Sequence, residues 1–523
     1  MKRPERLIPA IYDACDDFER PFSSMLRYGG PQSLAIDRIV LEVTGGKTIA
    51  PIVGSNREWE QAMHFVKAAA AGQAVDFSEV ISSLSYALDI TEGQPAGHAA
   101  RSCILGMRIA RELGLDVADR SALFYALLLK DLGCSSNASK VCYLFGTDDR
   151  KTKCDLKTTD WTRLSESMRY VARNVVQDGT MLQKASRFVA VAARGQKAAK
   201  ELVQIRCDRG AAIARSLLLP EATAVAIHSL DEHWDGSGYP DCLHGDAIPL
   251  FGRILGLAQT AEVFWHRGGV EAACEVARKR SGTWFDPQLV EVLLSLEGDA
   301  ALAADMGCDD AAGIAAKLEP AELVIHADED ALDRVSEGFS HVIDAKSPWT
   351  FCHSSGVAEV ATGIGSVLGI EGRRLQKLRR AALLHDIGKL GVSNQILDKP
   401  GKLNAEELAA MRKHPDFTLK ILSRVRAFRD FAEAAASHHE RLDGRGYHRG
   451  MSGAALSLEV RILAVADMYE ALAAKRPYRQ DLSKEEVMTI LKREAGVGLC
   501  PSVVAALQSF LAHSNFVPYQ VAA

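Results

Sequence analysis

Apolar residues recur at three- and four-residue spacing through two long stretches of the chain, about 80–300 and about 335–515. One stripe of the first stretch consists of Val80, Ile81, Leu84 and Leu88. One stripe of the second consists of Val357, Val360, Ile364, Val367 and Leu368. This spacing is typical of amphipathic helices, and most prolines fall between the stripes. The pattern predicts a helical bundle in each stretch.

The first 75 residues have a different pattern. Residues 34–43 alternate partly between apolar and polar positions and end at the turn signal Thr44-Gly45-Gly46-Lys47, which predicts one or two short strands. Residues 59–71 have the pattern of a helix. We therefore predict a mainly α protein with two tandem helical bundles and a small mixed α/β N-terminal segment, whose role the sequence does not assign.

The two helical stretches are copies of each other. His98 precedes Lys130 by 32 residues, just as His353 precedes His385 by 32 residues. Three further pairs of segments match in the same order: 129–133 with 384–388, 231–240 with 439–448, and 253–259 with 461–467. Repetition of whole blocks in one order indicates a tandem duplication.

The duplication predicts the domain organisation. Residues 1–75 form the N-terminal segment, 76–300 the first copy and 336–523 the second copy. The acidic stretch 301–335 is interpreted as a connector. The first copy contains an insertion of about 45 residues near 138–200.

The second copy contains a set of residues that suit a metal centre. The candidate ligands are His353, His385, Asp386, His414, His438, His439 and Asp467. Imidazole and carboxylate together suit iron, manganese or zinc. Seven ligands exceed the need of one ion, and a carboxylate such as Asp386 can bridge two. Two neighbouring ions polarise a phosphodiester and hold a hydroxide in line with the scissile bond.

The alternative for any one histidine is an ordinary surface or capping residue. An adjacent His-Asp, an adjacent His-His-Glu and a later Asp would all have to coincide by chance, so the joint pattern favours the metal site. Most of the ligands are predicted to fall late on a helix or just past one, where several helices of a bundle can converge on one pocket.

Several residues near these ligands are candidates for contacts with substrate. Lys389 would stabilise a phosphate oxygen as a point charge, and Arg476 and Arg479 would clamp phosphate. Gly444 lets the backbone turn behind the double histidine, and Tyr447 would pack under a base or brace the loop. The alternatives are a solvated helix-end lysine and a charged turn.

Composition excludes some functions. A net charge of −5 gives no basic surface for a nucleic acid polymer. No apolar run is long enough for a membrane span, and the N-terminus lacks the apolar segment of a signal peptide. The 11 cysteines form no CxxC pair, so we expect reduced thiols and a cytoplasmic location, with Cys134 and Cys352 as packing residues.

The motifs of residues 384–389 and 438–447 resemble those of the HD-GYP family, a branch of the HD phosphohydrolase superfamily that hydrolyses cyclic di-GMP. The resemblance implies that the seven ligands hold two divalent metal ions, with iron or manganese expected, and that His385, Asp386 and Lys389 are catalytic. It also makes Lys389, Arg476 and Arg479 substrate contacts and implies a bacterial source. Two positions depart from the family. His448 replaces the proline of Gly-Tyr-Pro, and Trp349 replaces a glutamate that some members use for a third metal.

The first copy departs further, because Lys130, Leu230, Asp231 and Gln259 replace four ligands. Either Arg206 or Cys207 stands where His414 aligns. We interpret this copy as catalytically inactive. It would regulate, dimerise, contact a signalling partner or bind a nucleotide without cutting it, or it would serve only as structural support.

Three functions follow from these observations. The leading hypothesis is a metal-dependent phosphodiesterase that hydrolyses cyclic di-GMP in bacterial signalling. The second is an HD phosphohydrolase acting on another nucleotide, including cyclic GMP-AMP. The third is a non-catalytic scaffold that senses a nucleotide.

Overall fold

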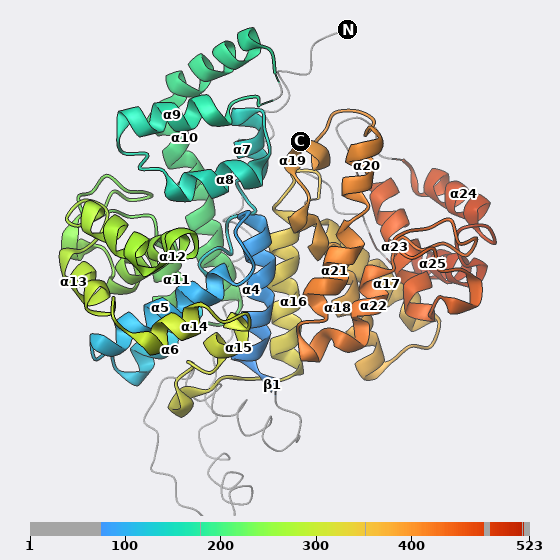
Figure 1. The fold of residues 1–523 in the computed structure, drawn as a ribbon. Coiled ribbons are helices and arrows are strands. Elements are labelled where there is room, and N and C mark those ends of the chain that lie inside the picture. The colour runs from blue at the N-terminus through green and yellow to red at the C-terminus, as the bar shows by residue number, and fades with distance from the viewer. Residues whose placement is uncertain (1–74, 178, 351, 475–481, 515, 517–523) are drawn as a thin grey trace, which may run out of the picture. The chain divides into compact units, whose positions relative to one another are not determined.

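The computed structural model describes residues 75–516, apart from 178, 351, 475–481 and 515. The expected N-terminal strands and helix therefore lie outside the described residues, as do Arg476 and Arg479. Within the described part, helices make up nearly all regular structure (Figure 1). They are joined by one two-stranded antiparallel sheet, in which β1 (Val75–Asp76) pairs with β2 (His326–Ala327). The predicted mainly α fold is confirmed.

The helices repeat in order through the two copies. Those of the first copy are α4 (Phe77–Thr91), α5 (His98–Glu112), α6 (Val117–Leu129), α11 (Glu221–His228), η4 (Gly245–Ala247), α12 (Leu250–Arg280) and α13 (Pro287–Ser295). Their counterparts are α16 (Glu329–Asp344), α17 (His353–Val367), α18 (Gly372–Leu384), α22 (Arg429–Ala436), η8 (Gly453–Ala455), α23 (Leu458–Ala473) with α24 (Lys484–Glu494), and α25 (Pro501–His513).

Other helices complete each copy. The inserted residues of the first copy form α7 (Ala138–Phe145), α8 (Asp149–Thr158), α9 (Leu164–Asn174) and the first part of α10 (Met181–Ser216). After α13 come α14 (Ala300–Met306), α15 (Ala311–Ala316) and η5 (Ala321–Leu323), and α14 and α15 pack against α5. The second copy adds η6 (Ile387–Gly391), α19 (Asn394–Leu397), α20 (Ala405–Met411), α21 (His414–Leu422) and η7 (Arg426–Phe428).

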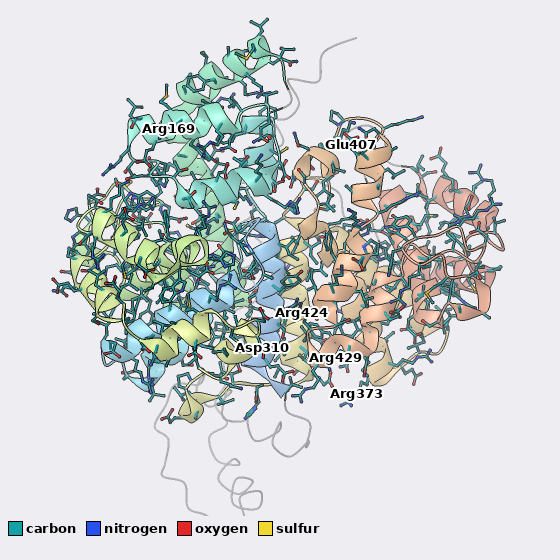
Figure 2. The ribbon with its side chains drawn as sticks, in the orientation of Figure 1. Arg169, Asp310, Arg373, Glu407, Arg424 and Arg429 are labelled. Carbon is teal, nitrogen blue, oxygen red and sulfur yellow. The ribbon has the colours of Figure 1, made fainter. Side chains whose placement is uncertain are left out.

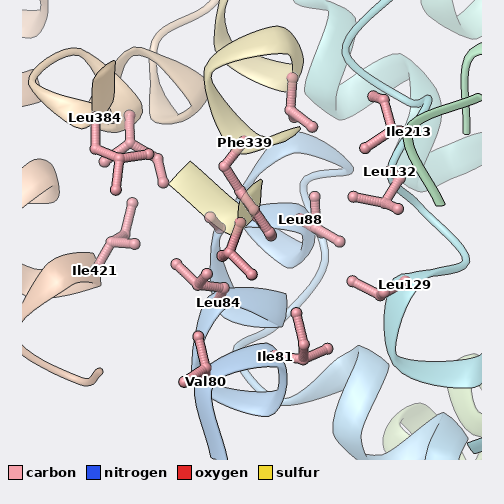
Figure 3. Close-up of a cluster of buried hydrophobic side chains, with 14 of the residues drawn as sticks. Val80, Ile81, Leu84, Leu88, Leu129, Leu132, Ile213, Phe339, Leu384 and Ile421 are labelled. Carbon is pink, nitrogen blue, oxygen red and sulfur yellow. The ribbon is translucent and has the colours of Figure 1, made fainter. Parts of the chain in front are cut away.

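Helix α4 shares one hydrophobic core with both copies. Figure 3 shows its residues Val80, Ile81, Leu84 and Leu88 beside side chains of the first copy, such as Leu129, and of the second, such as Leu384. All of these side chains are fully buried. Burial of each large aliphatic side chain contributes about 2 kcal/mol. Continuous burial along α4 therefore ties the two copies into one compact unit.

Helix α4 also makes a surface contact with the second copy. The guanidinium of Arg424, labelled in Figure 2, lies 4.0 Å from the centre of the Tyr86 ring on α4. This cation–π contact joins the end of α21 to α4. No helix in the described ranges has the length and apolar character needed to cross a membrane.

Candidate metal centre

The seven candidate ligands come from five regions of the second copy. His385 and Asp386 directly follow α18, and His438 and His439 follow α22 by one residue, as the sequence predicts. His353 and His414 instead begin α17 and α21, and Asp467 lies in the interior of α23. The expectation that most ligands end helices is therefore met by four of the seven. All seven nevertheless converge.

Asp386 lies at the centre of the cluster. Its Oδ2 is 3.3 Å from His385 Nε2 and 3.6 Å from His353 Nε2. Its Oδ1 is 3.4 Å from His414 Nε2 and 3.6 Å from His438 Nε2. The two carboxylate oxygens thus face two different sets of histidines, which is the arrangement that a carboxylate bridging two ions requires.

The remaining ligands complete two groups, one on each side of Asp386. Asp467 Oδ1 lies 3.3 Å from His353 Nε2 and 3.8 Å from His385 Nε2. On the other side, ring nitrogens of His414, His438 and His439 lie within 4.8 Å of one another. Atoms at these separations can share one ion, so each group could hold a metal.

Backbone carbonyls orient three of the histidines. Nδ1 of His385, His414 and His438 each donates to the carbonyl oxygen three residues earlier, at 2.7, 2.8 and 2.7 Å respectively. A carbonyl only accepts, so Nδ1 carries a hydrogen, and Nε2 is the nitrogen that can bind a metal when the ring is neutral. The three Nε2 atoms therefore face the cluster as metal-ligand atoms.

His353 is oriented by a carboxylate that the sequence analysis missed. Its Nδ1 bonds Glu470, which is buried on α23. The first copy repeats this pair, because His98 Nδ1 bonds Glu262. Glu470 lies three residues past Asp467, and Glu262 lies three past Gln259. This three-residue spacing, repeated in both copies, is the sequence signal that could have identified the two carboxylates.

The protonation states suit a cation. Burial opposes ionisation of Asp386, but His385 and Lys389 outweigh it and hold the pKa of this carboxyl well below its usual range. Burial lowers the pKa of His414 to about 3 and that of His439 to about 4. The carboxylate is thus charged while these two rings are neutral, which is the state in which they bind metal.

A buried cluster of this kind needs a cation to satisfy it. His385 Nε2 and Asp386 Oδ1 are both buried without a hydrogen-bond partner among the described residues. Burial opposes the charged ring of His353, yet Glu470 and Asp467 raise its pKa to about 10, which shows how much negative charge surrounds it. The oxygen and imidazole donors fit divalent first-row metals.

Three further side chains lie near the cluster. Lys389, on η6, places Nζ 2.5 Å from Asp386 Oδ2 and is partly exposed. The Tyr447 ring lies 4.8 Å from that of His439, and the guanidinium of Arg412 lies 5.2 Å from the Tyr447 ring. The sequence analysis did not identify Arg412. These groups could contact a bound anion and a base.

The loop after the double histidine is held by Glu440. Its carboxylate accepts hydrogen bonds from the backbone N–H groups of Arg449, Gly450 and Met451. Gly444 has a φ of 70°, in the left-handed region that favours glycine, as the predicted turn requires. Glu440 and Gly444 therefore fix the loop that carries Tyr447.

The first copy replaces metal ligands with cations. Lys130 Nζ bonds Asp131, the counterpart of Asp386, and Lys157 of α8 lies 3.3 Å from the other Asp131 oxygen. Arg206 Nη2 lies 2.5 Å from Asp231 Oδ2. Three side-chain cations thus surround the position in the first copy that corresponds to the metal centre of the second. The inserted Lys157 has no counterpart in the repeat, so the sequence comparison could not find it.

The structure also decides between Arg206 and Cys207. A Cβ on Gly388 would lie 1.9 Å from the carbonyl oxygen of His414, and one on Gly133 would lie 1.8 Å from that of Arg206. Because Gly133 and Gly388 are equivalent in the repeat, Arg206 is the counterpart of His414.

Comparison with known proteins finds relatives of this chain. A model of the HD domain matches residues 186–289 and 337–502. The chain is 42% identical over 441 residues to a 3'3'-cGAMP-specific phosphodiesterase of Vibrio cholerae, covering 84% of this chain and 95% of that protein. It is 37% identical over 153 residues to a cyclic di-GMP phosphodiesterase response regulator of Xanthomonas campestris, covering 29% and 40%. The crystal structure of a cyclic GMP-AMP-specific phosphodiesterase of V. cholerae has a TM-score of 0.58 at 38% identity, covering 84% of this chain and 99% of that one.

Proposed function

The chain belongs to the HD domain family, and on that premise we propose that it is a metal-dependent phosphodiesterase that hydrolyses 3'3'-cyclic GMP-AMP. The observation that carries the proposal is the complete set of candidate ligands on both sides of Asp386. In the first copy, side-chain cations stand at the same place. The activity is therefore assigned to the second copy.

In this proposal the two ligand groups would hold two divalent ions, iron or manganese, with the carboxylate of Asp386 facing both groups. Bound ions of this kind polarise a phosphodiester and neutralise charge that develops on its oxygens. Lys389 contributes a further positive charge beside Asp386, where it would bind a phosphate oxygen. Tyr447 and Arg412 would hold the base of the nucleotide near His439.

The choice of substrate rests on similarity. The sequence motifs favour cyclic di-GMP, with cyclic GMP-AMP as the alternative. The relative described as 3'3'-cGAMP-specific matches over 95% of its length, whereas the cyclic di-GMP phosphodiesterase of X. campestris matches over 40%. Similarity over both copies, and not only over the second, therefore supports the mixed dinucleotide.

Cyclic di-GMP is the second candidate substrate. The motifs of residues 384–389 and 438–447 resemble the family that cleaves it, and the X. campestris relative is named for that activity. The departure at His448, where the family has proline, lies next to Tyr447 in the loop over the site. This loop is the part of the site where we expect the two substrates to be distinguished.

The test is hydrolysis by the purified full chain loaded with Mn²⁺ or Fe²⁺. We expect kcat/KM for 3'3'-cyclic GMP-AMP to exceed that for cyclic di-GMP by about tenfold or more, a difference of about 1.4 kcal/mol in transition-state binding. His385→Ala and Asp386→Ala should each remove both turnover and bound metal. Faster cleavage of cyclic di-GMP would refute the substrate assignment. A metal-loaded chain that cleaves no cyclic dinucleotide would refute the enzyme itself.

A further inference from the structure

The first copy contains a cavity of about 780 Å³. Helices α7 to α10 form much of its wall, and the loop 230–239 with α12 and Trp284 forms the rest. Its volume falls within the range of cavities that bind small molecules and cofactors. None of the seven candidate metal ligands lines it, so the cavity is separate from the site in the second copy.

Stacked aromatic rings line one side of the cavity. Trp161, from the insertion, lies parallel to Tyr239, with ring centres 5.4 Å apart and an angle of 13° between the planes. His233 stacks on Trp284 at 4.1 Å and 21°. Such a cluster can serve as core packing alone, but these rings border an open volume. Aromatic surfaces of this kind favour ligands that contain a flat aromatic ring. Any nucleobase can stack on them, because every base has a π-face.

Positive charge lies beside the rings. The charged side chains that line the cavity are the cations Lys153, Lys157, Arg206 and Arg253 and the carboxylates Glu92, Asp231 and Glu232. The cations exceed the carboxylates by one. Arg206 and Arg253 line the cavity, and the Nε of each is buried without a hydrogen-bond partner among the described residues. A phosphate oxygen would satisfy such donors.

The cavity lies at the position in the first copy that corresponds to the candidate metal centre of the second copy. Asp231, Tyr239 and Gln259 line it, and they are equivalent to His439, Tyr447 and Asp467. The metal ligands are replaced, however, and Lys130 and Lys157 both bond Asp131. A ligand bound here would meet side-chain ammonium groups at that place. The cavity is therefore built for binding and lacks the groups for hydrolysis.

We propose that this cavity binds a purine nucleotide without cutting it. The base would lie against Trp161 and Tyr239, and phosphate would face Arg206 and Lys157. The proposal does not depend on which substrate the second copy hydrolyses. It gives the inactive copy a specific role as a nucleotide receptor.

The test uses the full chain carrying Asp386→Ala and stripped of metal, so that the second copy neither cleaves nor holds substrate through metal. Isothermal titration with 3'3'-cyclic GMP-AMP and, separately, with GMP should detect one saturable site for at least one of them. Trp161→Ala in the same background should weaken that binding about tenfold or more. No saturable binding of either nucleotide, or binding unchanged by Trp161→Ala, would overturn the proposal.

Two substitutions of exposed residues test the same proposal without the risk that the protein fails to fold. Leu164 lines the cavity and is 77% exposed, so Leu164→Glu adds a negative charge at its edge without disturbing the core. Leu182 is 81% exposed on α10 and does not line the cavity, so Leu182→Glu is the matched control. We expect Leu164→Glu to weaken nucleotide binding and Leu182→Glu to leave it unchanged. Equal effects of the two variants would contradict the assignment. Turnover by the metal-loaded wild-type chain tests the function of the second copy separately.

Discussion

Arg150, at the start of α8 in the first copy, donates a hydrogen bond from Nη1 to the carbonyl oxygen of Gly391, at 2.6 Å. Gly391 is the last residue of η6, the short helix that carries Lys389. The neighbouring Asp149 accepts a hydrogen bond from the backbone N–H of Asn394 and lies 3.2 Å from Lys346 Nζ. The inserted helix α8 of the first copy thus supports the segment that follows the His-Asp pair.

The first prediction concerns this contact. Arg150→Ala removes a charge-assisted hydrogen bond that fixes the end of η6, so the Lys389 ammonium is held less firmly. We expect kcat to fall several-fold while bound metal stays at the wild-type level, because no ligand is touched. Lys151→Ala is the matched control, since Lys151 bonds Gln177 within the insertion. An equal loss of turnover in both variants would show that the contact with Gly391 has no specific role.

The second prediction concerns Glu470 as a positioning residue for His353. Glu470→Gln weakens the bond that orients the ring, so we expect metal affinity to fall about 10–100-fold, measured by competition with a chelator. Glu262→Gln changes the equivalent residue of the first copy, where it contacts His98 and Arg101. This control should leave metal affinity unchanged. If it lowered metal affinity as much as Glu470→Gln, the second copy would not be the metal-binding one.

Sequence alone predicted the mainly helical fold. It also named the seven candidate residues, Asp386 among them, that the structure brings together, because ligand motifs are local in the sequence. It did not predict contacts made between distant segments. Lys157 comes from an insertion without a counterpart, and Glu470 acts through a pairing across 117 residues. The choice between Arg206 and Cys207 depended on the close approach of Gly133 to a carbonyl. Arg476 and Arg479 stay predictions.

The third prediction separates the charge of Lys389 from metal binding. Lys389→Met keeps most of the side-chain volume but removes the ammonium beside Asp386, and we expect kcat to fall about 100-fold with the metal content unchanged. Lys399→Met is the control, because Lys399 pairs with Glu407 away from the ligands. Metal analysis and turnover on the same sample give both values. A Lys389→Met enzyme with wild-type kcat would exclude a role for this lysine in the reaction.

The fourth prediction uses the two equivalent glycines. A methyl group on Gly388 would overlap the carbonyl of His414, and one on Gly133 would overlap the carbonyl of Arg206, so each Gly→Ala change must push α21 or α10 away. We expect each variant to lower the free energy of unfolding by about 1–3 kcal/mol, measured by urea denaturation.

Only Gly388→Ala moves a candidate ligand, so it should also lower metal affinity and turnover. Gly133→Ala should unfold more easily yet keep metal affinity and kcat per folded molecule. The two added methyl groups would overlap carbonyl oxygens to nearly the same extent. A difference in metal affinity between the two variants therefore reports the position of the metal centre and not a general loss of stability. Loss of metal from Gly133→Ala would place a metal ion in the first copy and contradict the interpretation that Lys130 and Lys157 replace it.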